Sequence, residues 1–145
     1  MAYYRGKYSP KNKHKYIGNN SLIIYRSSWE LSMMIWLDNN PIVKSWVSEE
    51  TIVPYYFNDK WHKYFVDFKV IFANGNTWLI ELKPNAQTKL PEQPKRQTTK
   101  YLLECQMYIK NQCKWKAARQ YAEERNWKFY VLTKQALKEM GVKII

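Results

Sequence analysis

The sequence is poor in residues that bind zinc or form disulfides, with two cysteines and two histidines among 145 residues. Cys105 and Cys113 lie in a segment of helical composition at a spacing that matches no zinc motif, so we expect reduced thiols. His14 and His62 alone give little support for a catalytic zinc site. Carboxylates would therefore have to bind any catalytic metal, and such oxygen ligands favour Mg²⁺ or Mn²⁺.

Long apolar runs are also missing. No stretch of about 18 apolar residues occurs, so the sequence predicts no transmembrane helix. Residues 1–18 are basic and contain no apolar segment of the kind found in secretory signal peptides. We therefore expect no membrane partner.

Acidic residues are scarce relative to basic ones. The chain has 12 Asp and Glu against 24 Lys and Arg, for a formal net charge of +12. Such an excess repels itself and usually indicates an anionic partner, most often nucleic acid. The hydrophobic share of 46% and the aromatic share of 17% indicate one folded domain rather than a disordered chain.

The first 26 residues combine basic and aromatic side chains and contain no acidic residue. Pro10 and Gly18 interrupt regular structure, so we expect an irregular basic arm over residues 1–26 and a single domain over residues 27–145. The basic residues of the arm are predicted to contact nucleic-acid phosphates: Arg5, Lys7, Lys11, Lys13, Lys15 and Arg26. The interleaved tyrosines, Tyr3, Tyr4, Tyr8 and Tyr16, are predicted to pack on the domain or on bases. The alternative is a tail that lies over the domain without a nucleic-acid role.

A helix is predicted to begin at Ser27. The segment Ser27-Ser28-Trp29-Glu30 has the form of a capping box, in which the Glu30 carboxylate accepts a hydrogen bond from the Ser27 amide. Apolar residues follow at helical spacing, and Asn39-Asn40-Pro41 ends the helix. From spacing alone, Glu30 therefore has a structural explanation.

Residues 42–57 are predicted to form a connection followed by one strand, Thr51 to Phe57. Pro54 suggests that this strand lies at an edge or starts there. Glu49 and Glu50 precede the strand and are expected to be solvated. Asn58-Asp59 then supplies a turn.

The stretch from Trp61 to Lys83, WHKYFVDFKVIFANGNTWLIELK, is predicted to form two strands around a turn at residues 74–76. Alternation places Glu81 and Lys83 on one face of the second strand. A two-residue loop would put Asp67 opposite Leu82, whereas a loop of three or five residues would put it opposite Lys83 and diagonal to Glu81. We predict a loop of odd length or a β-bulge.

Two interpretations of this hairpin follow. In the first, Asp67 and Glu81 bind one Mg²⁺, and Lys83 orients a water molecule or offsets developing phosphate charge. In the second, the same side chains and Lys69 form a solvated face with cross-strand ion pairs.

The remaining residues complete an α/β pattern. Residues 84–98 contain three prolines and form a loop, whose Lys89, Lys95 and Arg96 either contact a nucleic-acid backbone or belong to a mobile surface excursion. Residues 99–125 are helical, with a break near residues 111–114. The apolar residues of both halves are expected in the core: Leu102, Leu103, Met107 and Ile109, then Trp115, Ala118, Tyr121 and Ala122. A strand over residues 128–133 and a helix over residues 134–140, ended by Gly141, follow. This order predicts helices packed on a central sheet.

Asp67 followed by Glu81-Leu82-Lys83 resembles the PD-(D/E)xK nuclease motif, with Val66 at the position where proline is usual. Five stretches extend the likeness over nearly the whole chain: YRSSWE, WVSEETIVPYYF, YFVDF, WLIELKP and KWKAARQYAEERNWKFYVLT. Together they are similar to the TnsA-like branch of that superfamily, and most similar to the head completion nucleases of T4-like phages.

The resemblance implies a restriction endonuclease-like fold, an α/β architecture with a mixed central sheet flanked by helices. It also implies that Asp67 and Glu81 bind Mg²⁺ or Mn²⁺ and that Lys83 assists the attacking water. Glu30 lies where the family places a helix glutamate of the active site, which implies that it is also catalytic.

The activity implied by the resemblance is that of a metal-dependent endonuclease that hydrolyses phosphodiester bonds of double-stranded DNA. It would act in phage head completion or DNA packaging, in the host cytoplasm or in the virion, beside head, portal or neck proteins. Two alternatives stay open. One is a non-catalytic head completion protein that binds DNA, and the other is an unrelated basic nucleic-acid-binding domain.

Overall fold

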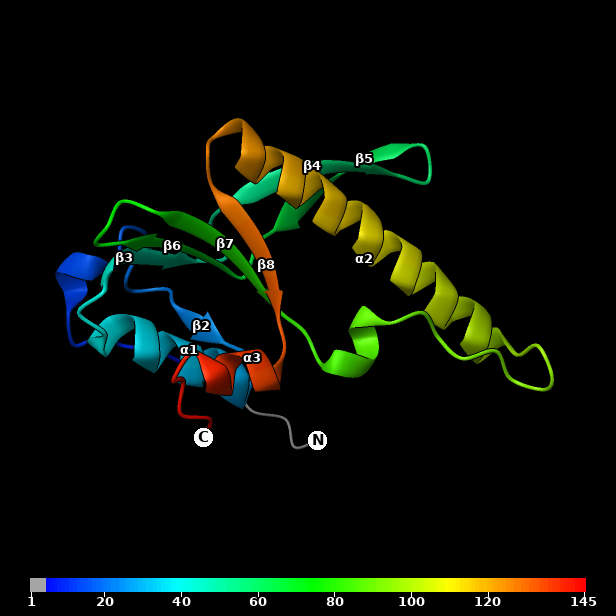
Figure 1. The fold of residues 1–145 in the computed structure, drawn as a ribbon, viewed down its shortest axis with the longest axis horizontal. Coiled ribbons are helices and arrows are strands. Elements are labelled where there is room, and N and C mark those ends of the chain that lie inside the picture. Colours follow the sequence, from blue (N-terminus) through cyan, green and yellow to red (C-terminus); the bar gives the residue numbers. More distant parts are fainter. Residues whose placement is uncertain (1–4) are drawn as a thin grey trace.

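The centre of the molecule is a four-stranded mixed sheet with the strand order β3-β6-β7-β8 (Figure 1). The computed structural model describes residues 5–145, so the roles predicted for Tyr3 and Tyr4 lie outside the described residues. The strands are β3 (Val43–Ser48), β6 (Phe68–Phe72), β7 (Thr77–Leu82) and β8 (Lys128–Leu132). The first three are antiparallel neighbours, and β8 runs parallel to β7. The predicted α/β class is confirmed, and the fold is restriction endonuclease-like.

Helices and a hairpin cover both faces of this sheet (Figure 1). Helices α1 (Ser28–Asn39) and α3 (Lys134–Glu139) lie against one face. Helix α2 (Thr99–Glu124) and the hairpin of β4 (Ile52–Phe57) and β5 (Lys60–Phe65) lie against the other. The shorter elements are β1 (Gly6–Lys7), β2 (Ile24–Tyr25) and the 3₁₀ turns η1 (Lys13–Lys15) and η2 (Asn85–Thr88). None of the helices in the described part of the chain has both the length and the apolarity needed to cross a bilayer.

Alternation along the central strands gives the sheet two cores. The first lies under α1 and α3 and includes Met33, Met34, Leu37, Phe68, Val70, Ile80 and Leu137. The second lies under α2 and the β4–β5 hairpin and includes Val53, Tyr64, Val66, Leu79, Trp115, Ala118 and Phe129. Each fully buried large apolar side chain stabilises the fold by about 1.5–3 kcal/mol relative to an exposed one. The two cores therefore fix the sheet from both sides.

The first arm of the predicted hairpin is two strands rather than one. β5 pairs with β4 up to Phe65, whereas β6 pairs with β3 from Phe68 onward. The arm thus changes its partner strand at Val66 and Asp67. Two backbone hydrogen bonds mark this change: the Val66 amide donates to the Thr51 carbonyl at 3.0 Å, and the Glu49 amide donates to the Asp67 carbonyl at 3.1 Å. The sequence did not reveal β3, because this strand lies within the segment predicted to be a connection.

The loop between β6 and β7 has an odd number of residues, as predicted. Ile71 pairs with Thr77, and the Phe72 amide donates to the Asn76 carbonyl at 2.8 Å. The register is shifted by two residues from the predicted one, because Phe68 pairs with Ile80. Extended by one residue, this register places Asp67 directly opposite Glu81 rather than opposite Lys83. The parity was therefore right, and the predicted diagonal arrangement was wrong.

Helix α2 is continuous, so the break predicted near residues 111–114 is wrong. The expectation that the apolar residues of its first half lie in the core is also wrong. Leu102, Leu103, Met107 and Ile109 expose at least half of their surface. Figure 1 shows the reason, since only the second half of α2 lies over the sheet and hairpin, and the first half extends beyond them beside residues 84–98.

The described part of the predicted arm packs on the domain. Tyr16 and Ile23 are buried in the first core, and β1 pairs with β2. Asp38, near the end of α1, is fully buried and accepts hydrogen bonds from the Tyr8 hydroxyl and the Lys11 and Asn12 amides at 2.6–3.0 Å. Residues 5–26 are therefore held by the body, while a division of the chain at residue 26 stays a prediction.

We expect Asp38→Asn to destabilise the fold by about 2–4 kcal/mol, because hydrogen bonds to an ionised acceptor contribute about 1.5–3 kcal/mol each. Burial raises the pKa of Asp38, but the hydrogen bonds from Tyr8, Lys11 and Asn12 outweigh burial and lower the net pKa. A carboxyl with a lowered folded-state pKa stabilises the fold above its unfolded-state pKa and loses this effect in acid. Urea unfolding should therefore show a difference in the free energy of unfolding between wild-type and Asp38→Asn proteins at neutral pH, and this difference should shrink as the pH falls. The exposed Asp59→Asn is the control, and equal effects of the two substitutions would contradict this role of Asp38.

Candidate active site

Acidic side chains from four separate segments converge at one edge of the central sheet. Glu30 lies in the first turn of α1, Glu49 follows β3, Asp67 lies between β5 and β6, and Glu81 lies near the end of β7. A cavity of about 520 Å³ is lined by Glu30, Asp67, Glu81 and Lys83. The structure thus brings together all four residues that the sequence predicted to be catalytic.

Glu30 is positioned by the start of α1. The Ser27 hydroxyl accepts a hydrogen bond from the Glu30 amide at 3.1 Å, so the first half of the predicted capping box is present. The Glu30 carboxylate accepts from the Arg26 amide, one residue earlier than predicted. Burial raises the pKa of Glu30, and the charge of Glu49 raises it further, while the Arg26 amide lowers it. A side chain that helps to cap the helix can therefore also face the other carboxylates.

Asp67 is held by the backbone of Leu82, the residue that follows Glu81 on β7. Its Oδ2 accepts a hydrogen bond from the Leu82 amide at 2.8 Å. Burial and the charge of Glu81 raise the pKa of Asp67 well above its ordinary value, although the Leu82 amide opposes the shift. The side chain is therefore a largely desolvated carboxyl beside another acid, which is an arrangement typical of functional sites.

Glu81 is buried, with 6% of its surface exposed. The Tyr64 hydroxyl donates to its Oε2 at 2.6 Å, and the Lys83 ammonium lies 3.8 Å from its Oε1. Lys69, on the same strand face as Asp67, instead lies over the Trp127 ring at 4.4 Å from the centroid. These contacts do not describe a solvated row of cross-strand ion pairs, so the second interpretation of the hairpin is wrong.

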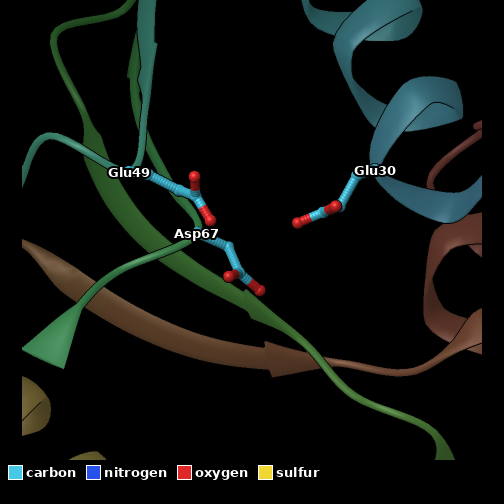
Figure 2. Close-up of side chains that lie close together, drawn as sticks. All are labelled: Glu30, Glu49 and Asp67. Atoms are coloured by element: carbon cyan, nitrogen blue, oxygen red, sulfur yellow. The ribbon is translucent and has the colours of Figure 1, made fainter. Parts of the chain in front are cut away.

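Glu49 is a candidate site residue that the sequence did not indicate. One carboxylate oxygen each from Glu30, Glu49 and Asp67 lie within 4.8 Å of one another, and Figure 2 shows the three side chains pointing toward a common space. Glu49 has a φ of 56°, which turns the chain between β3 and β4. The sequence predicted a solvated Glu49. That prediction missed the site because β3, the strand that brings Glu49 beside Asp67, was not recognised. The Glu49 carboxylate is also paired with the Arg26 guanidinium.

Lys114 of α2 also faces the site, and the sequence gave no signal for it. Its ammonium lies 5.3 Å from the centroid of the Tyr64 ring. Burial lowers the pKa of Lys114, while the charges of Glu81 and Asp67 oppose this shift. Helix α2, which packs in the second core, thus places a cationic group near Glu81 and Asp67 on the side of the sheet opposite α1.

The residues predicted to contact nucleic acid occupy different environments. Arg26 lines the cavity, and Lys89 lines a neighbouring one of about 590 Å³ that shares Lys83. Exposed positions are held by Arg5, Lys7, Lys11, Lys13, Lys95 and Arg96. Lys15 is buried, and its ammonium donates to the Asp38 and Asn40 carbonyls at 3.0 and 2.8 Å. The structure therefore does not present Lys15 to a phosphate, and this part of the prediction is corrected.

The donor set is suited to a hard divalent cation. Carboxylate oxygens are the preferred ligands of Mg²⁺, and the described residues that line the cavity include no histidine or cysteine. Burial, and then the charge of neighbouring carboxylates, raise the pKa values of Glu30 and Asp67, so their ionised forms are disfavoured without a cation. A bound cation would offset this repulsion. Glu30, Glu49 and Asp67 bring one oxygen each close enough together to hold it, and Glu81 lines the same cavity.

Asp67→Asn should stabilise the metal-free protein. Because the folded-state pKa of Asp67 is raised, ionisation opposes folding as the pH rises from the unfolded-state pKa through the folded-state pKa. Asparagine cannot ionise, yet its side-chain oxygen can still accept from the Leu82 amide. We expect a gain of about 1–2 kcal/mol in the free energy of unfolding near pH ~8 that disappears near pH ~4. Urea unfolding without divalent metal measures it, with Asp59→Asn as the control. A loss of stability at the higher pH would contradict the crowding of charge.

Comparison with known proteins agrees with this geometry. A family model described as the TnsA-like endonuclease N terminal matches residues 40–134. The chain is 39% identical over 146 residues to the head completion nuclease of Enterobacteria phage T4, and the alignment covers 97% of each chain. No solved structure matches. The resemblance expected from the sequence is therefore confirmed, and the chain belongs to the TnsA-like endonuclease family.

Proposed function

We propose that this protein is a Mg²⁺-dependent or Mn²⁺-dependent endonuclease that hydrolyses phosphodiester bonds of double-stranded DNA. The observation that carries the proposal is the convergence of Glu30, Asp67, Glu81 and Lys83 on one cavity. The net charge of +12 suits a polyanionic substrate. The family membership supports the same reaction class, and the PD-(D/E)xK reading of Asp67, Glu81 and Lys83 is part of the proposal.

The residues that line the cavity have different roles in the proposed hydrolysis. When bound, a divalent cation would withdraw charge from the phosphate oxygens and acidify a water molecule. Asp67 and Glu81 would hold that cation, with Glu30 and Glu49 completing the acidic set. Lys83 lies beside Glu81, where its ammonium can orient the attacking water and donate hydrogen bonds to a phosphate oxygen. Of these groups, Glu81 is buried, whereas Asp67 is partly exposed in the cavity.

Contacts with the DNA backbone would come from basic residues around the cavity. We assign this role to Arg26 and to the other basic residues that the structure leaves outside the core: Arg5, Lys7, Lys11, Lys13, Lys89, Lys95 and Arg96. Such contacts position a duplex without reading its sequence. By its likeness to the T4 protein, the chain would act in phage head completion, in the infected host or in the virion, where head, portal or neck proteins are candidate partners.

Wild-type protein with Mg²⁺ or Mn²⁺ should nick supercoiled plasmid DNA, and a chelator should stop the reaction. Asp67→Ala removes a metal ligand and Lys83→Ala removes the cationic group, so each should lower the rate about 10²–10³-fold. Lys143→Ala, at an exposed lysine that does not line the cavity, is the matched control and should cleave normally. Equal rates for wild-type and Asp67→Ala proteins would contradict the proposal.

The same variants separate catalysis from a purely structural role in the phage particle. Phage that lacks the protein can be complemented with either the wild-type or the Asp67→Ala chain. The endonuclease proposal expects infectious particles only from the wild-type chain. Full rescue by a folded but inactive Asp67→Ala chain would favour a non-catalytic, DNA-binding head completion protein.

Glu49→Gln should weaken the binding of the catalytic Mg²⁺, because it removes one negative charge from the cluster with Glu30 and Asp67. We expect the Mg²⁺ concentration at half-maximal rate to rise about 10-fold, as for other changes around metal ligands. Glu50→Gln is the control, since Glu50 is exposed and not part of the cluster. An unchanged Mg²⁺ dependence in Glu49→Gln would remove Glu49 from the site.

A further inference from the structure

Tyr64 contacts Glu81 from outside the set of residues that the family motif contains. It lies near the end of β5, on the core-facing side of the β4–β5 hairpin, and only 3% of its surface is exposed. Its hydroxyl donates to Glu81 Oε2 at 2.6 Å. Short bonds between a hydroxyl and a carboxylate are among the stronger neutral-to-ion hydrogen bonds in proteins. This contact therefore fixes one of the two oxygens of Glu81.

The tyrosine ring has little freedom to move. It is packed in the second core with Leu79 and Trp115. The Lys114 ammonium lies over its face, 5.3 Å from the centroid. A tyrosine hydroxyl is protonated at neutral pH and can donate a hydrogen bond. The packing of the ring sets the direction of this donor.

Asp67 is restrained in the same manner by a backbone donor. Its Oδ2 accepts from the Leu82 amide at 2.8 Å. Each of the two acidic residues therefore has one oxygen that accepts a hydrogen bond from the protein. For Glu81 the second oxygen is Oε1, and this is the atom 3.8 Å from the Lys83 ammonium.

The number of oxygens that a carboxylate offers affects which cation it prefers. Ca²⁺ takes six to eight oxygen ligands, often with both oxygens of one carboxylate, in a flexible geometry. Mg²⁺ takes six ligands in a strict octahedron and keeps several water molecules. A glutamate limited to one oxygen suits Mg²⁺ and offers less to Ca²⁺.

We propose that Tyr64 is a positioning residue that restricts Glu81 to a single metal-binding oxygen and thereby makes the site selective for Mg²⁺ over Ca²⁺. The inference rests on the proposed function, because it concerns the same cation site. The proposal assigns Tyr64 no direct contact with the cation or the substrate. It acts through Glu81, and its removal would release Oε2 as a second ligand.

Tyr64→Phe tests this proposal, with Tyr55→Phe as the matched control. Tyr55 lies on the paired strand of the same hairpin, is buried to the same 3%, and belongs to the same core. Calorimetric titration of the DNA-free proteins with MgCl₂ and with CaCl₂ gives both dissociation constants. We expect Tyr64→Phe to raise the Kd for Mg²⁺ about 10-fold and to leave the Kd for Ca²⁺ the same or lower, so that the selectivity ratio falls about 10-fold or more. Tyr55→Phe should leave the ratio unchanged.

A second measurement does not depend on the folding of Tyr64→Phe. The separation between the two carboxylate stretching bands in the infrared differs between one-oxygen and two-oxygen binding. In wild-type protein loaded with Mg²⁺ or Ca²⁺, the band that is lost in Glu81→Gln should have the separation typical of one-oxygen binding. A two-oxygen signature for Glu81 in the Mg²⁺ form would overturn the proposal.

The outcomes distinguish this inference from the proposed function. If wild-type protein binds neither cation, the proposed function fails and this inference fails with it. If wild-type protein binds Mg²⁺ and Tyr64→Phe loses affinity for both cations equally, or for neither, only the role of Tyr64 in selectivity is overturned. Cleavage by Tyr64→Phe that recovers at high Mg²⁺ would support a positioning role over a general loss of structure.

Discussion

The exchange of partner strands at Val66 and Asp67 is the constraint on which the site depends. The chain leaves β4 and joins β3 within two residues, and the Glu49 amide bonds to the Asp67 carbonyl at this point. The side chain of Asp67 is thereby free of strand packing and is held instead by the Leu82 amide. One backbone irregularity thus brings Glu49, Asp67 and Glu81 together. A regular hairpin would have left Glu49 remote from both.

The electrostatic consequence is a site that opposes folding in the absence of a cation. Asp67 and Glu30 are desolvated beside other acids, and both have raised pKa values. The fold tolerates this because two independent cores hold the sheet and because donors are supplied locally by Arg26, Tyr64 and the Leu82 amide. Function and stability therefore conflict at this edge, as expected where charge is concentrated for binding or catalysis.

The sequence could predict those features of the fold that depend only on residues close together along the chain. Alternation along a strand is local, so the shared face of Glu81 and Lys83 and the odd-length loop followed from the pattern. Register and partner choice depend on β3, which the pattern did not show, and Glu49 was missed for the same reason. Composition likewise cannot tell which part of a helix is covered, so the exposed first half of α2 was assigned to the core. Lys15 looked like its neighbours Lys11 and Lys13, yet only its ammonium meets buried carbonyls.

The site lies where the two cores meet, so its geometry depends on packing in both. Glu30 is carried by α1, which packs in the first core, whereas the partner of Glu81, Tyr64, belongs to the second. β7 supplies residues to both, with Ile80 and Leu82 on one side and Leu79 on the other. The spacing of Glu30 from the carboxylates of the sheet therefore depends on packing in the first core, and the position of Glu81 depends on its contact with the second. Because protein interiors are close-packed and deform little, a cavity-forming substitution in either core would change that spacing even if every acidic residue remained in place.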